Sequence, residues 1–313
     1  MDRYVHGNQS FNNYPSSQAL ILAYAVQLSY GVPSLIRYFT ILYNIIHSSW
    51  YKVPFYTLFL VDGVINIMSF IYNMGIRFID LGLFPRFVVW MPLGYYLTIL
   101  YLLVYYTIYA PMISILIISF NRFTSAFLGL KYDRFWRDHL WKFILFILIS
   151  PILFAWHIFF SQAFWVSLDG GGFSMDYSKE IPWIRNSQNM MIISTFVMLS
   201  SIIFTYSTLL RLRHIASKEV RSAERRLLMI TGVMVASLMG QFLIAFIFYF
   251  NGIVFKIREE TYDWLLLLRP FIADLSILAP PWIMHFLNKK MANNKLDTTS
   301  SSSIVVAVKQ AKY

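Results

Sequence analysis

Two aspartates stand inside long apolar stretches, where a carboxylate supports proton or ion chemistry. Asp62 begins a polar stripe on one face of a helix, which continues at spacings typical of helices through Asn66, Ser69 and Asn73. Asp274 lies in a later apolar stretch, and we expect it to be linked to Asp62 through a shared water, ion or proton. Charged groups in apolar surroundings are costly, so they mark function or a paired interior site. The network of Asp62, Asn66 and Asp274 is either structural or an ion or proton site that shifts between states.

A cation and a group of aromatic rings are candidates for ligand binding. Arg269 has three possible roles: pairing with an anionic ligand group, bonding a nearby carboxylate such as Asp263 or Glu260, or extending to the membrane surface. Most aromatic rings in apolar helices face lipid or pack against other helices, but a subset is expected to wall an apolar pocket. We therefore expect Tyr95, Tyr96 and Arg269 to contribute to a ligand-binding site.

Catalytic chemistry has little support in the residue types. The chain has no cysteine, which excludes disulfides, thiolate zinc sites, thiol nucleophiles and palmitoyl anchors. Its six histidines are scattered, and the H-E-x-x-H, G-x-S-x-G and Walker A patterns are absent. An intramembrane enzyme with paired aspartates remains a formal alternative. We expect no enzyme activity, no cofactor and no bound metal.

The composition is that of an integral membrane protein. Hydrophobic residues make up 58% of the 313 residues and charged residues only 13%, with a mean hydropathy of +0.57, which is too apolar for a water-exposed surface. The net charge of +11 arises from basic residues grouped between apolar stretches. That grouping is typical of loops facing the cytoplasm, so we expect no nucleic-acid partner.

Seven nearly charge-free stretches are long enough to cross a bilayer, which predicts an all-α fold, a seven-transmembrane helix bundle. The expected spans are residues 19–43, 55–74, 93–120, 141–161, 188–210, 227–250 and 264–287. The domain organisation is then an extracellular tail at 1–18, the membrane domain at 19–287 and a disordered cytoplasmic tail at 288–313.

The distribution of Lys and Arg sets the expected orientation. One set of connections, with the C-terminal tail, carries 18 of these residues, and the other set, with the N-terminal tail, carries 7. The N-terminus is therefore predicted outside and the C-terminus inside. Asn8 begins an N-glycosylation sequon on the outer side. The inner tail carries a candidate phosphorylation cluster: Thr298, Thr299, Ser300, Ser301, Ser302 and Ser303.

The long charge-free run that ends at Asn121 passes directly into basic and aromatic residues at the predicted inner surface. Arg122, Lys131 and Tyr132 follow it, and Arg225 and Arg226 belong to the next basic connection. A basic inner face of this kind binds either lipid headgroups or an acidic protein partner.

Asn121-Arg122-Phe123, at the inner end of the third span, resembles the Asp-Arg-Tyr motif of G-protein-coupled receptors. Residues 121–125 followed by 130–136 resemble, more specifically, nematode serpentine chemoreceptors of class gamma. Segments 28–34, 223–228 and 274–282 are similar to the same family. Asn121 replaces the family's acid, which leaves open what restrains Arg122, and Asp133 and Asp138 are candidates.

The resemblance implies a chemosensory receptor in the plasma membrane of a sensory neuron or cilium. It implies a small, largely apolar environmental or pheromone-like ligand and coupling to a heterotrimeric G protein through Asn121, Arg122, Lys131, Tyr132, and the pair Arg225 and Arg226. Membrane lipid is a further partner, and a kinase or arrestin would act on the tail. A ligand-gated channel or transporter is the alternative, motivated by Asp62 and Asp274.

Overall fold

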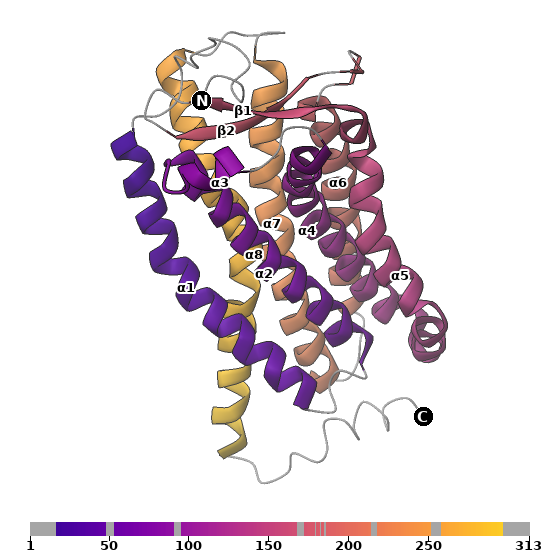
Figure 1. Ribbon diagram of the computed structural model, residues 1–313. Coiled ribbons are helices and arrows are strands. Elements are labelled where there is room, and N and C mark those ends of the chain that lie inside the picture. Colours follow the sequence, from indigo (N-terminus) through magenta and orange to yellow (C-terminus); the bar gives the residue numbers. More distant parts are fainter. Residues whose placement is uncertain are drawn as a thin grey trace.

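The chain folds into a bundle of long helices in the computed structural model (Figure 1). The structure describes residues 17–47, 53–90, 95–167, 172–178, 180–181, 183–184, 186–213, 218–251 and 258–296. Asn8 and the cluster at 298–303 lie outside these ranges, as do the side chains of Arg226, Glu260 and Asp263.

Seven long helices carry the fold within the described part of the chain. They are α1 (Ser17–His47), α2 (Pro54–Asp80), α4 (Tyr95–Leu128), α5 (Tyr132–Phe154), α6 (Asn186–Arg213), α7 (Lys218–Phe250) and α8 (Glu259–Leu296). Six continuous helical segments in the described ranges are long and apolar enough to cross a membrane, and one of them, Tyr95–Phe154, comprises both α4 and α5. The predicted helical membrane bundle is therefore confirmed, with short helices α3 (Pro85–Trp90), η2 (Gly129–Lys131) and η3 (Trp156–Phe160) between the long ones.

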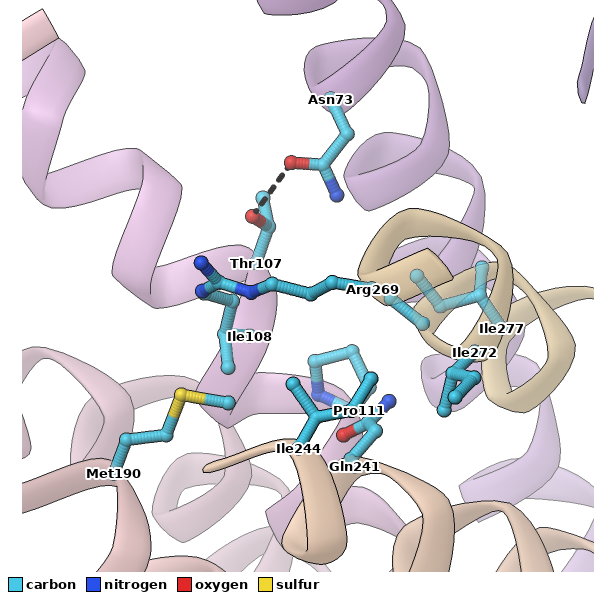
Figure 2. Close-up of a pocket in the computed structure, with 11 residues that line it drawn as sticks. Asn73, Thr107, Ile108, Pro111, Met190, Gln241, Ile244, Arg269, Ile272 and Ile277 are labelled. Atoms are coloured by element: carbon cyan, nitrogen blue, oxygen red, sulfur yellow. Dashed lines mark hydrogen bonds between the residues drawn. The ribbon is translucent and has the colours of Figure 1, made fainter. Parts of the chain in front are cut away.

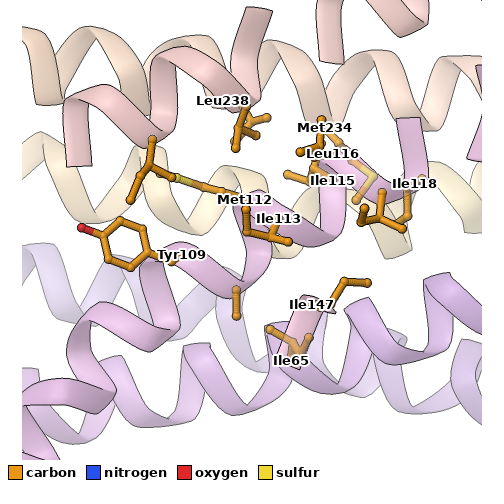
Figure 3. Packing of buried hydrophobic residues seen from close by; sticks show 14 of the residues in the cluster. Ile65, Tyr109, Met112, Ile113, Ile115, Leu116, Ile118, Ile147, Met234 and Leu238 are labelled. Atoms are coloured by element: carbon orange, nitrogen blue, oxygen red, sulfur yellow. The ribbon is translucent and has the colours of Figure 1, made fainter. Parts of the chain in front are cut away.

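Helix α4 is the central element. It packs against α2, α5, α6 and α7, whereas α1 packs on α2 and α8 at one side of the bundle. Met112, Ile113 and Ile118 of α4 are buried, and Ile147 of α5 and Met234 of α7 meet the same cluster (Figure 3). With no charge from Phe87 to Asn121, nearly every face of α4 is apolar enough to be covered by neighbouring helices.

Most of the long helices extend beyond the apolar stretches that predicted them, and α2 and α5 are two examples. Helix α2 continues past Met74 to Asp80, and α5 begins at Tyr132 rather than near residue 141. Hydropathy marks only the lipid-spanning part of a helix, and polar turns continue the backbone hydrogen bonding where their side chains find partners. Arg77, assigned to a loop from sequence, consequently lies inside the bundle and is 7% exposed.

A β-hairpin that the all-α prediction did not include crosses one end of the bundle (Figure 1). Strand β1 (Ala163–Ser167) pairs antiparallel with β2 (Phe173–Tyr177), with Ala163 opposite Tyr177. The Thr98 hydroxyl fastens the hairpin to α4, donating to the Ser161 carbonyl at 2.9 Å and accepting from the Ala163 amide at 3.2 Å. We call this the hairpin end of the bundle, and the opposite end the Arg122 end.

Candidate functional site

Arg122 lies at the junction of three helices near the Arg122 end. Its side chain is buried, and its Nη1 forms an ion pair with Glu224 Oε2 of α7 at 3.2 Å. Its Nη2 donates to Asn121 Oδ1 at 2.6 Å, and the guanidinium lies 4.3 Å from the ring centroid of Phe55 in α2. Arg122 therefore joins α4 to α7 while the Phe55 ring covers it.

The acid that contacts Arg122 is Glu224 of α7 and not Asp138, one of the two candidates from the sequence. Asp138 instead pairs with Arg137 at 3.6 Å in an exposed ion pair. Glu224 also accepts from the Ser125 hydroxyl at 3.5 Å, which brings a second α4 residue to the same carboxylate. Closeness along the chain suggested the two aspartates, but helix packing decides the partner.

Asn121 contacts Arg122 and also ties α4 to α5. Its amide donates to the Tyr132 hydroxyl at 2.9 Å, and one turn further on the Trp136 indole donates to Thr124 Oγ1 at 2.8 Å. Gly129, with a φ of +50°, makes the turn between the helices, a conformation that side chains disfavour.

The predicted docking residues separate into two groups. Tyr132 is buried against α4 and is not on the surface, whereas Lys131 and Arg225 are exposed at the Arg122 end. Arg226 lies in α7, but its side chain is outside the described part of the structure. Lys131 and Arg225 are therefore exposed cations at the same end of the bundle as the buried Arg122.

Asp62 and Asn66 lie together in the interior, on the predicted face of α2. The Asn66 amide donates to Asp62 Oδ2 at 2.9 Å and to the Tyr38 hydroxyl at 3.1 Å, and Tyr38 donates to the Ile277 carbonyl of α8 at 2.8 Å. Ser114 of α4 faces the same carboxylate. Hydrogen bonds in the cluster thus connect α1, α2 and α8, without a charged partner for Asp62 among the described residues.

Asp274 has its own partners, in place of the expected link to Asp62. Arg77 holds the Asp274 carboxylate with two contacts of 3.3 and 3.4 Å, and the Tyr30 hydroxyl donates to it at 2.7 Å. Arg77 also donates to Gln27 Oε1 at 2.7 Å. Arg77 lies roughly 22 Å beyond Asp62 along α2 at about 1.5 Å per residue, so the two carboxylates occupy different levels of the bundle.

A cavity opens among α2, α4, α6, α7 and α8, toward the hairpin end (Figure 2). It contains about 460 Å³ of unfilled space, its mouth included. Most of its wall is aliphatic, with Arg269, Gln241, Asn73 and Thr107 as polar members. The full lining is Asn73, Thr107, Ile108, Pro111, Met190, Gln241, Ile244, Arg269, Ile272, Ala273 and Ile277. We call this space the Arg269 cavity.

Of the three residues predicted to bind a ligand, Arg269 lines this cavity and Tyr95 and Tyr96 do not. Both tyrosines lie in the first turn of α4 with exposed side chains, at 75% and 67% of their full exposure. Further along α4, Tyr101 and Tyr105 form an aromatic group that the ligand-site prediction did not include. Tyr105 contacts Tyr101 and accepts from the Asn186 amide at 2.6 Å.

The hairpin adds a tyrosine beside this group. The Tyr177 ring packs 5.1 Å from that of Tyr101. Burial, with smaller effects of Tyr105 and Asp176, raises the pKa of Tyr177 to about 12. Tyr177 therefore stays neutral at physiological pH and contributes no charge near the cavity.

Comparison with known proteins points to one family. The chain is 26% identical over 300 residues to serpentine receptor class gamma-5 of Caenorhabditis elegans, covering 92% of this chain and 90% of the relative. It is 24% identical to serpentine receptor class gamma-4 of the same organism, covering 87% of each chain, and 25% identical to class gamma-10, covering 71% and 70%.

The family model agrees with these relatives and with the resemblance drawn from the residues. It describes the Srg family chemoreceptors and matches residues 24–294, which include most of α1 and α8, the whole of the other five long helices and both polar clusters described above. The chain therefore belongs to the Srg chemoreceptor family and is a multi-pass membrane protein.

Proposed function

We propose that the protein is a chemosensory receptor that couples to a heterotrimeric G protein. A small, largely apolar molecule binds in the Arg269 cavity and favours a bundle whose Arg122 end is open. The ligand acts by population shift, since it changes an equilibrium only by as much as it binds one state better than the other. The hairpin end faces outside and the Arg122 end faces the cytoplasm.

The observation that carries this proposal is the Arg122–Glu224 ion pair. It joins α4 to α7 at 3.2 Å, and both helices also line the Arg269 cavity. A ligand that moves α7 relative to α4 therefore acts on both places. When the pair separates, Arg122 becomes available to a protein partner, beside the exposed Lys131 and Arg225.

Further parts of the proposal concern partners and location. The basic face of Lys131, Arg225 and Arg226 also attracts anionic lipid headgroups of the inner leaflet. Phosphorylation of the cluster at 298–303 by a kinase makes the tail anionic and favours uncoupling, with arrestin as a partner. Asn8 carries a glycan, and the receptor resides in the plasma membrane of a sensory neuron or its cilium.

A reporter assay tests the proposal. Cells expressing the receptor with a G-protein reporter are exposed to a panel of small apolar and amphiphilic compounds. We expect a response to at least one compound, and we expect Arg122→Ala to abolish it at equal surface expression. A response that Arg122→Ala leaves intact contradicts the role of Arg122, and no response across the panel with any G protein counts against the receptor function.

One observation favours a second function, a ligand-gated channel or transporter. Asp62 is fully buried at mid-bundle and has amide and hydroxyl neighbours but no cationic partner among the described residues, which is typical of ion or proton sites in membranes. Currents or uptake that persist with G proteins inactivated, and that Asp62→Asn abolishes, are the result expected of this alternative.

A further inference from the structure

Arg269 differs from the two buried arginines, Arg77 and Arg122, because it has no anionic partner among the described side chains. Arg77 is paired with Asp274, and Arg122 with Glu224. Among the described side chains, Arg269 has no hydrogen bond or ion pair, and its guanidinium makes a cation–π approach of 5.9 Å to the ring of Phe248. Its side chain is exposed, so a molecule in the cavity reaches it.

The position of Arg269 directs this cation into the cavity. It lies five residues after Trp264, the first residue of the last membrane span, which is roughly 8 Å into the span at about 1.5 Å per residue. In Figure 2 the side chain extends from α8 across the cavity toward Thr107 and Ile108 of α4. No carboxylate lines the described wall, so the charge has no counterpart within it.

The other residues of the cavity wall limit the kind of molecule that could present an anionic group to Arg269. Aliphatic side chains from α4, α7 and α8, among them Ile108, Ile244 and Ile272, face the same space. The Gln241 amide donates to Ser276 Oγ, while its Oε1 is buried without a hydrogen-bond partner among the described residues. The cavity therefore offers a cation, an apolar wall and one free acceptor.

From these features we infer that the ligand is a monocarboxylate amphiphile, whose carboxylate pairs with Arg269 while its apolar body lies against the isoleucines. A guanidinium presents two parallel N–H donors that match a carboxylate, and such charge-assisted pairs are stronger away from water. A hydroxyl or amide on the ligand body would donate to Gln241. This inference rests on the proposed function, because it names the ligand class for the same cavity.

Direct binding tests the inference without requiring signalling. The full chain in detergent or nanodiscs is titrated with hexanoate, octanoate and decanoate, each compared with its methyl ester, and thermal stabilisation gives the apparent affinity. We expect at least one acid to bind about tenfold or more tightly than its ester, because a charge-assisted hydrogen bond is lost in the ester. Arg269→Gln removes this preference and Arg269→Lys retains part of it. Arg258→Gln, an exposed cation at the same end, leaves it unchanged.

Each other outcome has a definite meaning. If no acid is preferred over its ester, or if Arg269→Gln keeps the preference, the inference is overturned. If the preference for the acid appears only after Glu260→Gln and Asp263→Asn are combined in one variant, Arg269 is paired with those carboxylates of α8 in the wild type, and the inference is also overturned. A G-protein response to neutral compounds alone overturns the inference about the ligand and leaves the proposed receptor function standing. Acid binding without any G-protein response supports the inference about the ligand and counts against the proposed receptor function.

Discussion

At the scale of single residues, the buried charged side chains Asp274 and Arg122 are each held by specific partners. Asp274 accepts hydrogen bonds from Arg77 and Tyr30. Arg122 donates hydrogen bonds to Glu224 and Asn121. A buried ion pair is costly to break from one side, because the remaining charge loses its partner and stays away from water. These pairs therefore fix how the helices that carry them are oriented.

A double-mutant cycle tests the Arg77–Asp274 pair. Each single change, Arg77→Gln and Asp274→Asn, should destabilise the bundle by about 3–5 kcal/mol, because it leaves an unpaired charge in the interior. The double variant should cost clearly less than the sum of the two. Thermal unfolding in detergent and surface expression are the measurements, and additive costs contradict the pairing.

Tyr132 offers a second test at this scale. Tyr132→Phe removes the hydroxyl that accepts from Asn121, so a buried amide loses its partner, at a cost of about 1–3 kcal/mol. Tyr206→Phe is the matched control, because Tyr206 is 59% exposed on α6. The melting temperature should fall for the Tyr132 variant alone, and equal melting temperatures for both variants contradict the contact.

At the scale of elements, the hairpin is held to the bundle without a disulfide. Thr98 fastens one side of it, and Gly172 lies against the end of α2, where a Cβ atom would come within 1.6 Å of the Asp80 carbonyl oxygen. The clashing atoms belong to the backbone of α2 and cannot rotate away as a side chain could, so any side chain at residue 172 must displace the hairpin. Close packing at Gly172 therefore helps to hold the hairpin against the end of α2.

Replacement of that glycine tests the attachment. Gly172→Ala should loosen the hairpin, which we expect to appear as faster proteolysis of the hairpin in intact cells and weaker ligand responses. Gly75→Ala is the control, since a Cβ there meets nothing within 4 Å and alanine favours a helix by about 1 kcal/mol. Similar proteolysis of the two variants argues against the close approach at Gly172.

The extent of the helices shows what sequence predicts and what it does not. Charge-free length predicted all seven long helices, because lipid requires each crossing segment to satisfy its own backbone. Arg77 was missed since charge was taken as the end of the second span. The stripe of Asp62, Asn66 and Asn73 continues at the next helical position to Arg77, so this spacing contained the signal.

Partners between helices were less predictable than the helices. Whether Asp274 meets Asp62 or Arg77, and whether Arg122 meets Asp133 or Glu224, depends on the rotation and depth of each helix. Hydropathy reports neither of these. Tyr95 and Tyr96 illustrate the same limit, because being near the outer end of a helix does not decide which face meets a cavity.

At the scale of the whole molecule, signalling from the cavity to a G protein requires a defined orientation in the membrane. Helix α1 begins at the hairpin end and α8 ends at the Arg122 end (Figure 1). The excess of Lys and Arg in the connections at the Arg122 end predicts that this end faces the cytoplasm. Cavity and basic face then lie on opposite sides of the membrane, as signalling requires.

Epitope tags at the two termini test this orientation. An antibody should stain an N-terminal tag on intact cells and a C-terminal tag only after permeabilisation. Staining of the C-terminal tag on intact cells contradicts the receptor account, because the basic face would then have no access to a G protein.

In the proposed receptor, the Arg122–Glu224 pair restrains a signalling state. Its most direct test is nucleotide exchange by added heterotrimeric G proteins on membranes that carry the wild type, Glu224→Gln or Asp138→Asn, matched for receptor amount and without ligand. Glu224→Gln should raise basal exchange several-fold, since losing an ion pair of about 1 kcal/mol or more shifts a two-state equilibrium by about fivefold. Asp138→Asn, which breaks only an exposed pair, should match the wild type. Basal exchange that is equal in all three membranes, for every G protein tested, would contradict the claim.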